Sequence, residues 1–151
     1  MTTDLDAVRA PLTALSDEEI MFRDAVAAFA EEQVRPRVAA MDRAGKLDPE
    51  LIPAFFELGL MGIAVPERYG GSGGSLMMVT LAVETVSCVD ASSAILMDVQ
   101  NTLVHSPITR YGNDAQRERY LTRLTSSTVG AYALSEPGSG SDAFGLTTRA
   151  V

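Results

Sequence analysis

The spacing of apolar residues along the chain predicts a protein built mainly of helices. Between Ser16 and Gly45 apolar side chains recur every three to five positions, which places them on one face of a helix. Ser16 followed by Glu19 is typical of a helix start, and Gly45 is typical of a helix end. Pro36 removes a backbone donor, so a kink is expected between Glu32 and Pro36. The apolar face comprises Phe22, Val26, Phe29, Val34, Val38 and Met41.

Four further helical regions follow from the same reasoning. Asp48 and Pro49 predict the start of a short helix that runs to about Leu58. The glycine-rich stretch 69–75 predicts a flexible connector rather than a phosphate loop, because no lysine follows in the required spacing. Residues 76–89 are apolar on nearly every side, which predicts a helix that is buried all round. The last two helices are expected to start at Asp90 or Ser92, running through Leu103, and at Asn113 or Asp114, running through Leu124.

The pattern changes at Val129. Residues 129–134 predict a short strand, and the glycines and proline that follow predict a tight turn at 137–140. A second strand is expected over 146–151. The fold class is therefore mainly α: an extended arm at 1–15, a helical domain at 16–126, and the first strands of a β-domain at 127–151.

Composition and charge exclude several classes of function. The net charge of −8 argues against nucleic acid, because no basic stripe is present to neutralise phosphates. One histidine, His105, and one cysteine, Cys88, cannot build a metal site; Cys88 is expected to be a buried apolar residue, and His105 to have no catalytic role. No run approaches the length of a membrane span, and the first residues do not resemble a secretory signal. We therefore expect a cytoplasmic protein, or an organelle protein already trimmed.

The segment with the strongest chemical signal is Tyr132–Asp142, YALSEPGSGSD. Pro137 turns the chain, and Gly138 and Gly140 allow backbone amides to approach a partner closely. Ser139 and Ser141 add hydroxyl donors, a combination that suits a pyrophosphate or a flavin edge. The dinucleotide pattern GxGxxG is absent. From the spacing alone, a purely structural turn is favoured over a ligand site.

The same segment resembles the flavin motif of acyl-CoA dehydrogenases, in which a strand ending in Thr or Ser leads into Glu-Pro-Gly and Gly-Ser-Asp. Here Ser135 stands where many relatives carry Thr. The stretch Glu57–Gly74 resembles the turn that joins the early helices of the family. The run VDASSAILMDVQNTL, from Val89, is similar to the short- and branched-chain members in particular.

The resemblance implies a fold of three parts, a helical domain, a middle β-domain and a second helical domain, of which this chain contains the first and the start of the second. It implies FAD as the cofactor and acyl-CoA as the substrate. In the family a base removes the proton alpha to the thioester carbonyl while the beta hydrogen leaves as hydride to the flavin. The implied FAD contacts are Tyr132, Ala133, Leu134, Ser135, Glu136, Pro137, Gly138, Ser139, Gly140 and Ser141, and Ser141 also contacts the acyl-CoA.

The resemblance also implies an acyl pocket, a base and partners. Four residues of one helix, Ile95, Leu96, Val99 and Leu103, are expected to line the acyl pocket, with ordinary core packing an equally favoured reading. The usual base is a glutamate of the carboxy-terminal domain, and neither Glu84 nor Glu136 matches it; Glu84 is expected to be a buried, paired carboxylate. An electron-transfer flavoprotein is the implied electron acceptor, and the full-length protein is expected to form a homo-oligomer, a tetramer.

Two alternatives stay open beside this hypothesis. An acyl-CoA oxidase of the same fold would carry the same motif and form hydrogen peroxide. Alternatively, the chain is a non-catalytic or truncated subunit that binds a companion through its apolar helices. In either case the 151-residue chain alone is expected to be inactive, because it contains no candidate for the catalytic base.

Overall fold

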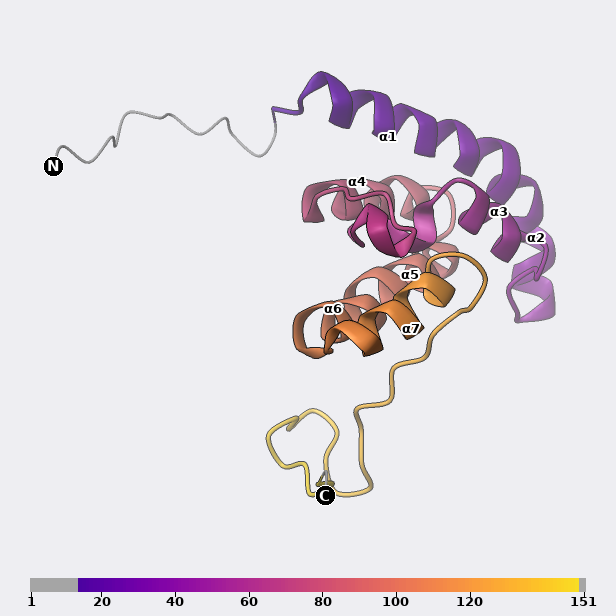
Figure 1. Cartoon of the computed structure of the whole chain (residues 1–151). Helices are drawn as coiled ribbons and strands as arrows, with labels where there is room; N and C mark the ends of the chain where they lie inside the picture. Colours follow the sequence, from indigo (N-terminus) through magenta and orange to yellow (C-terminus); the bar gives the residue numbers. More distant parts are fainter. Residues whose placement is uncertain (1–13, 150–151) are drawn as a thin grey trace, which may run out of the picture.

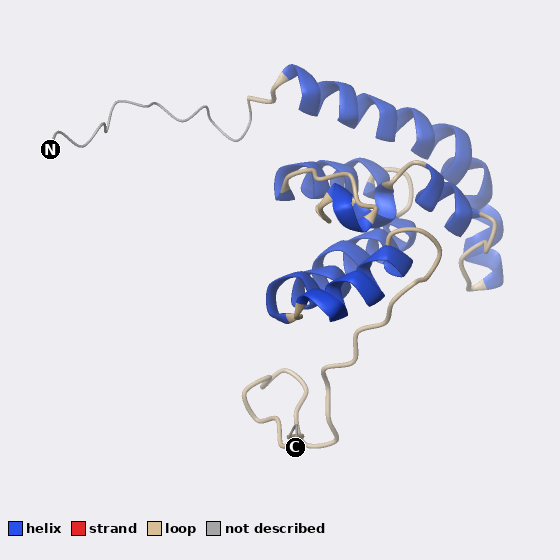
Figure 2. Ribbon diagram, viewed as in Figure 1, coloured by secondary structure: helices blue, strands red, loops and turns tan. Residues whose placement is uncertain are grey.

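Residues 14–149 are described by a computed structural model in which a group of packed helices is followed by an extended carboxy-terminal segment (Figures 1 and 2). Expectations for residues 1–13 and 150–151, including most of the arm, lie outside the described residues. The elements are α1 (Asp17–Phe29), η1 (Ala30–Val34), α2 (Arg35–Ala44), α3 (Leu51–Glu57), η2 (Leu60–Gly62), η3 (Glu67–Tyr69), α4 (Leu76–Ser87), α5 (Ala91–Asp98), η4 (Val99–His105), α6 (Ser106–Tyr111) and α7 (Asp114–Leu124). Among the residues described, no helix has both the length and the apolar character needed to cross a bilayer.

The first long helix starts and ends where the sequence predicts. The backbone amide of Glu19 donates to the Ser16 hydroxyl at 3.2 Å, and the Glu19 carboxylate accepts from the Ser16 amide at 2.8 Å. This reciprocal pair satisfies two amides that the helix leaves free. At the other end Gly45 takes the left-handed conformation, with a φ of 61°. The irregularity expected near Pro36 is the π-helical turn η1, and the helix changes direction there (Figure 1).

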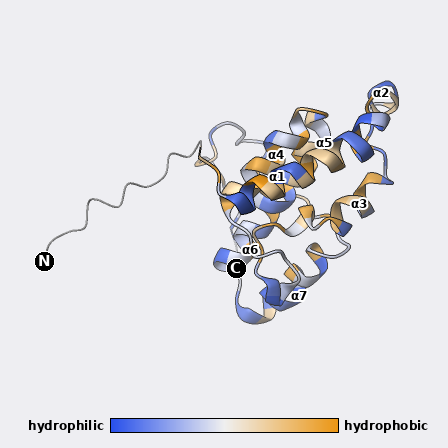
Figure 3. Cartoon of the chain, turned by 90° about the horizontal axis from the view of Figure 1, so that it is seen from above, coloured by the Kyte–Doolittle hydropathy of each residue, from blue (hydrophilic) through white to orange (hydrophobic). Residues whose placement is uncertain are grey.

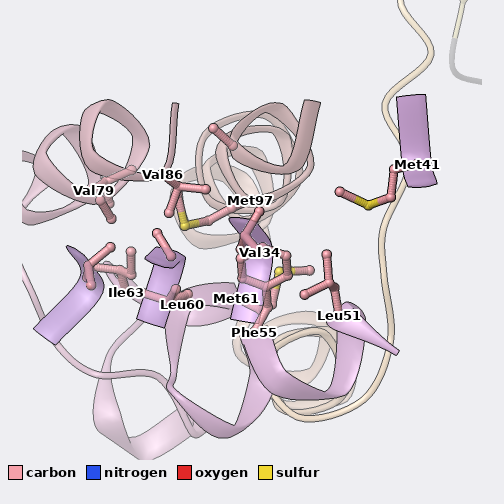
Figure 4. Close-up of a cluster of buried hydrophobic side chains, with 14 residues drawn as sticks. Val34, Met41, Leu51, Phe55, Leu60, Met61, Ile63, Val79, Val86 and Met97 are labelled. Atoms are coloured by element: carbon pink, nitrogen blue, oxygen red, sulfur yellow. The ribbon is translucent and has the colours of Figure 1, made fainter. Parts of the chain in front are cut away.

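The core lies between the α1–η1 helix, α3 with η2, and the α4–α5 pair. Figure 4 shows Val34, Phe55, Met61 and Met97 converging on one interior region. Hydrophobic residues are most frequent in α4 and α5, whereas α7 is mainly hydrophilic (Figure 3). The fully assembled cluster comprises Val26, Ala30, Val34, Met41, Leu51, Phe55, Leu60, Met61, Ile63, Val79, Ala82, Val86, Ala94 and Met97.

The prediction that α4 is buried all round is wrong for this chain. Leu76 is 70% exposed, and Thr80, Glu84 and Cys88 follow it on the same exposed stripe, four residues apart. Glu84 is therefore not a buried, paired carboxylate, and Cys88 is not a buried apolar residue. Sequence composition shows that a helix is apolar but not which neighbours are present to cover it.

The glycine-rich connector is packed rather than flexible, contrary to the prediction. The amides of Ser72, Gly73 and Gly74 donate to the carbonyls of Gly62, Val65 and Ile63, at 3.0, 2.9 and 2.7 Å. A Cβ added at Gly71 would lie 2.1 Å from the Val65 carbonyl oxygen, so only glycine fits. Because these amides are already bonded to carbonyls of residues 62–65, the segment serves as a connector and its amides are not available to a phosphate.

The last helices begin at the predicted caps. The Asp90 carboxylate accepts from the Ser93 amide at 2.8 Å and starts α5, which continues through the π-helical turn η4 into α6. Asn113 and Gln116 form a second reciprocal cap at the start of α7. The short helix α3 begins at Leu51, two residues after Pro49, and Gly59 ends it with a φ of 75°.

No strand forms over residues 129–134 or 146–149 of the described chain, contrary to the prediction. The only β-type pairing described there is the bridge between Glu136 and Ser139. A strand exists only when another strand pairs with it, and no other extended segment of residues 14–149 pairs with this one through backbone hydrogen bonds. Figure 2 shows the whole segment as loop extending away from the helices.

Candidate functional site

The segment that carries the flavin-like motif forms a closed loop on an extended stem, residues 128–135. The amide of Glu136 donates to the Ser139 carbonyl at 2.9 Å, and the Ser139 amide returns a bond to the Glu136 carbonyl at 3.0 Å. Pro137 and Gly138 occupy the two central positions of this turn, which suits the fixed φ of proline. The turn predicted at 137–140 is therefore confirmed, displaced by one residue.

The Glu136 carboxylate holds the base of the loop together. Its oxygens accept from the Thr147 amide at 2.8 Å, from the Thr147 hydroxyl at 2.9 Å and from the Thr148 amide at 3.0 Å. Hydrogen bonds from Thr148 and Thr147 to the carboxylate, with the largest contribution from Thr148, lower the pKa of Glu136 to about 2. The residue is thus a fixed anion that orders the loop, not a base that takes up a proton near neutral pH.

In the motif, the hydroxyl of Ser139 is hydrogen-bonded and the hydroxyls of Ser135 and Ser141 are free. The Ser139 hydroxyl donates to the Asp142 carbonyl, and its residue is only 3% exposed. Within residues 14–149 the hydroxyls of Ser135 and Ser141 have no hydrogen-bond partner, and both residues are exposed. A Cβ added at Gly138 or Gly140 would meet nothing within 4 Å, so the backbone there faces open space. Free hydroxyls beside accessible backbone fit a large polar ring system such as a flavin.

The four predicted acyl-pocket residues do not share one environment. Ile95 is 61% exposed and Leu103 is 40% exposed, and Val99, which lies between them at a spacing of four, is half-buried. Leu96 instead packs against the core cluster. The outward stripe of this helix, hereafter the α5–η4 stripe, therefore consists of Ile95, Val99 and Leu103. A shallow cavity of about 330 Å³ adjoins the same helix, where Thr102 and Asp98 face Val79 and Val83 of α4.

Gln100 is the residue that sequence reasoning missed. It lies on the inward side of η4, is 1% exposed, and bonds three backbone groups of the chain that leaves α7. Its Nε2 donates to the carbonyls of Leu124 at 2.7 Å and Thr128 at 3.0 Å, and its Oε1 accepts from the Gly130 amide at 2.8 Å. The available signal was two adjacent amide side chains, Gln100 and Asn101, in the middle of a helical segment, since buried amides require hydrogen-bond partners.

Asn101, the next residue, has a matching set of contacts on a different segment. Its Nδ2 donates to the carbonyls of Leu60 at 2.8 Å and Met97 at 2.9 Å, and its Oδ1 accepts from the Ile63 amide at 2.9 Å. It is 4% exposed. Two adjacent buried amides therefore fasten η4 to two regions of the chain: Asn101 to the η2 region, and Gln100 to the stem of the motif.

His105 is buried at the end of η4 and is the only histidine. It is 2% exposed, and neither ring nitrogen has a hydrogen-bond partner among the described residues. Burial lowers the pKa of the imidazole to about 4, and the nearby backbone of Leu124 opposes this shift only in part. The ring borders a cavity of about 390 Å³ with Asn101, Thr109 and Arg110. No group of three His, Cys, Asp or Glu side chains suited to a metal ion occurs within residues 14–149.

Comparison with known proteins identifies relatives over most of the chain. Residues 16–128 match the family described as acyl-CoA dehydrogenase, N-terminal domain. A probable short/branched chain specific acyl-CoA dehydrogenase of Dictyostelium discoideum is 48% identical over 93% of this chain and 34% of its own length. The mitochondrial short/branched chain specific acyl-CoA dehydrogenase of Bos taurus is 43% identical over 93% of this chain and 33% of its own length. The chain thus spans about a third of the length of these relatives.

Solved structures agree with these sequence relatives. The butyryl-CoA dehydrogenase of Megasphaera elsdenii superposes with a TM-score of 0.82 at 36% identity, over 89% of this chain and 36% of that one. A chain from structural work on the electron transferring flavoprotein of Acidaminococcus fermentans reaches a TM-score of 0.83 at 36% identity, over 87% of this chain and 35% of that one. These alignments cover more of the chain than the part that ends with α7 at Leu124. The similarity therefore extends into the segment that follows α7.

Proposed function

The chain belongs to the acyl-CoA dehydrogenase family, and from that premise we propose that it contributes to FAD-dependent alpha,beta-dehydrogenation of acyl-CoA thioesters, with short or branched acyl groups favoured. The observation that carries the proposal is the motif at 135–141, which has free hydroxyls and an accessible backbone. The stem of this motif is hydrogen-bonded to the same helix that carries the α5–η4 stripe. The branched-chain preference is supported by the names of the relatives from Dictyostelium discoideum and Bos taurus.

In this proposal FAD, when bound, supplies the acceptor for the hydride that leaves the beta carbon. The hydroxyls of Ser135 and Ser141 donate hydrogen bonds at the flavin edge, and Ser141 also contacts the acyl-CoA. The amides at Gly138 and Gly140 approach the cofactor closely because no side chain stands in the way. Tyr132, Ala133 and Leu134 lie in the stem, while Glu136, Pro137 and Ser139 shape the turn.

The α5–η4 stripe gives the proposed acyl pocket its apolar wall. Ile95, Val99 and Leu103 present aliphatic side chains at a spacing of four, so they follow one line along the helix. Leu96 supports this wall from the core side. Val99→Trp in the completed polypeptide is therefore expected to shift the preference toward shorter acyl groups, and an unchanged preference would remove these residues from the pocket.

The catalytic base lies elsewhere in this proposal. Glu136 has a pKa of about 2 and is bonded to the backbone at 147 and 148, and Glu84 is exposed on α4, far along the chain from the motif. Glu136 therefore does not suit proton abstraction near neutral pH, and Glu84 lies outside the motif. A base in a following domain agrees with the share of the relatives that the chain spans, about a third of their length.

The test uses the completed polypeptide, meaning this chain continued by the middle and carboxy-terminal domains of the family. The purified protein is expected to bind FAD and to lose the visible flavin absorbance when a short or branched acyl-CoA is added without oxygen. A colourless protein that gains no thermal stability from FAD would contradict the proposal, as would a flavin that stays oxidised with short, branched and long acyl-CoAs alike.

The electron acceptor separates the dehydrogenase from an oxidase of the same fold. We propose an electron-transfer flavoprotein as the partner, supported by the similar chain from the work on Acidaminococcus fermentans. The reduced flavin is expected to be reoxidised rapidly by such a protein and slowly by oxygen. Stoichiometric hydrogen peroxide in air would identify the oxidase instead.

A non-catalytic subunit is the second candidate, and one observation favours it. A groove of about 530 Å³ between α1 and α4 is lined by apolar residues that include Leu15, Ala27, Met77 and Leu81. Such a surface suits contact with another chain. Failure of the completed polypeptide to bind FAD, combined with a stable complex of this chain with a companion, would favour this candidate.

The assembly and location are further parts of the proposal. A tetramer of the completed polypeptide is expected to show in light scattering, and a monomer would contradict it. We propose a cytoplasmic location, although the Bos taurus relative is named as mitochondrial. Fractionation of the source cells would decide between the two compartments.

A further inference from the structure

We propose that Gln100 is a positioning residue that sets the distance between the flavin motif and the acyl-binding helix. This inference rests on the proposed function, since it assigns a role to a contact between the two proposed binding elements. The side chain of Gln100 leaves the inner face of η4, and the α5–η4 stripe occupies the outer face of the same helix. One helix therefore carries both the acyl wall and the anchor of the flavin stem.

The anchor is specific in its hydrogen bonding. The three groups bound by Gln100 are the carbonyls of Leu124 and Thr128 and the amide of Gly130, which lie 24, 28 and 30 residues away in sequence. A single primary amide supplies both donors and the acceptor. Because the side chain is 1% exposed, water does not replace these bonds if they are lost. The path of residues 124–130 is thereby fixed to η4 just before the motif begins.

A steric contact at the same place supports the assignment independently. A Cβ built on Gly130 would lie 2.4 Å from Cγ1 of Val104, which is also in η4. The backbone of Gly130 therefore lies directly against the helix, one turn along from Gln100. Hydrogen bonding at Gln100 and contact at Val104 together hold the stem at a single point.

The neighbouring Asn101 gives a matched control. Both amides lie in η4, both are almost fully buried, and each bonds two carbonyls and one amide. The partners of Asn101 lie at Leu60, Ile63 and Met97, away from the stem. Gln100→Met and Asn101→Leu each replace the amide by an apolar group of similar size. The two variants are therefore expected to lose similar thermal stability, and only the first releases the stem.

The experiment compares the completed polypeptide with both variants, in three measurements below the melting temperature of each. Hydrogen exchange reports the Gly130 amide, flavin fluorescence reports the dissociation constant for FAD, and steady-state kinetics separate kcat from the KM for acyl-CoA. In Gln100→Met we expect faster exchange at Gly130, weaker FAD binding, and a kcat lower by about tenfold or more. The KM is expected to change by no more than about threefold, because the acyl wall is intact.

The control variant separates positioning from general stability. Asn101→Leu is expected to keep the kcat, the FAD affinity and the Gly130 exchange of the parent. If Gln100→Met matches it in all three measurements, the inference is overturned. Gly130→Ala provides a second route should Gln100→Met not fold, since it displaces the stem from Val104 and leaves the Gln100 amide in place; unchanged kcat and FAD affinity there would also overturn the inference.

Failure of the proposed function gives a different result. A parent polypeptide that binds no FAD would remove the proposed function and this inference with it. A parent that binds FAD and turns over acyl-CoA, with Gln100 variants that behave alike, removes only the role of Gln100.

Discussion

At the scale of single residues, His105 is a buried neutral imidazole whose protonation opposes folding. Its pKa is about 4 in the folded chain and near 6.5 when unfolded, so between these values the unfolded state binds more protons. The folded chain is therefore fully favoured above pH 6.5 and loses stability as the pH falls toward 4. The loss approaches roughly 3 kcal/mol at 1.36 kcal/mol for each unit of pKa difference.

The measurement is urea unfolding of the chain and of His105→Gln at pH 7.5, 5.5 and 4.5. Glutamine is similar in size and does not titrate. We expect the free energy of unfolding of the parent to fall faster than that of the variant between pH 7.5 and 4.5. Equal slopes in the two proteins would show that His105 is not the group responsible.

Glu136 is a second residue with a large pKa shift, in a partly exposed position. Its carboxylate bonds the backbone at Thr147 and Thr148, and its pKa is about 2. The stabilisation from these contacts is fully present above pH 4.5, the ordinary pKa of a glutamate, and is lost as the pH falls through about 2. Glu136→Ala is expected to speed hydrogen exchange at the Thr147 and Thr148 amides at neutral pH and to leave the melting of the helices unchanged. Protection that survives in the variant would contradict the assignment.

At the scale of elements, the glycine connector depends on the absence of a side chain at Gly71. A methyl group there overlaps the Val65 carbonyl oxygen, which already accepts from Gly73. Gly71→Ala is expected to lower the free energy of unfolding by about 1–3 kcal/mol, since the packed loop must move. Gly140→Ala, which meets nothing within 4 Å, is the control and is expected to stay within about 0.5 kcal/mol of the parent in a denaturant titration.

The elements that could be predicted from sequence are those decided by neighbouring residues. The caps at Ser16, Asp90 and Asn113 bond amides three residues away, so the signal lies in the local sequence. The strand expected at 129–134 depends on a distant partner, and local composition does not report whether one is present. The prediction of a flexible connector at 69–75 is wrong for a similar reason, because the acceptors for its amides lie in the preceding residues 62–67.

In the candidate site, too, the features that could be predicted are those decided by residues close together in the sequence. The motif at 132–142 was recognisable because its residues are contiguous, and the turn at Glu136 and Ser139 follows from Pro137. The role of Gln100 was not recognisable, because its three partners lie 24 to 30 residues away. The exposure of Glu84 was missed because burial of α4 depends on which other segments are present.

At the scale of the whole molecule, the outer side of α1 and α4 determines how the isolated chain behaves. Leu76 is 70% exposed and Met21 is 68% exposed, and the groove between α1 and α4 is largely apolar. An exposed apolar surface of this kind favours association. We expect the 151-residue chain to form dimers or larger species at micromolar concentration, as measured by light scattering.

The double variant Met21→Glu with Leu76→Glu is expected to shift the chain toward the monomer. Tyr111→Glu serves as the control, because Tyr111 is 79% exposed but lies on α6, whereas Met21 and Leu76 lie on α1 and α4. Monomeric behaviour of the parent chain, or equal shifts in both variants, would show that another surface is responsible.

The single fastening of the stem has a geometric consequence for any enzyme built on it. From Gly130 to Ser135 the extended chain reaches at most about 17 Å, so it acts as a lever arm with its fulcrum at η4. A tilt of roughly 5° at the fulcrum then carries the Ser135 hydroxyl about 1.5 Å sideways, half the length of a hydrogen bond. Small repacking around Val104 is thus amplified at the far end, and selection for catalytic geometry should act on residues that never meet the substrate.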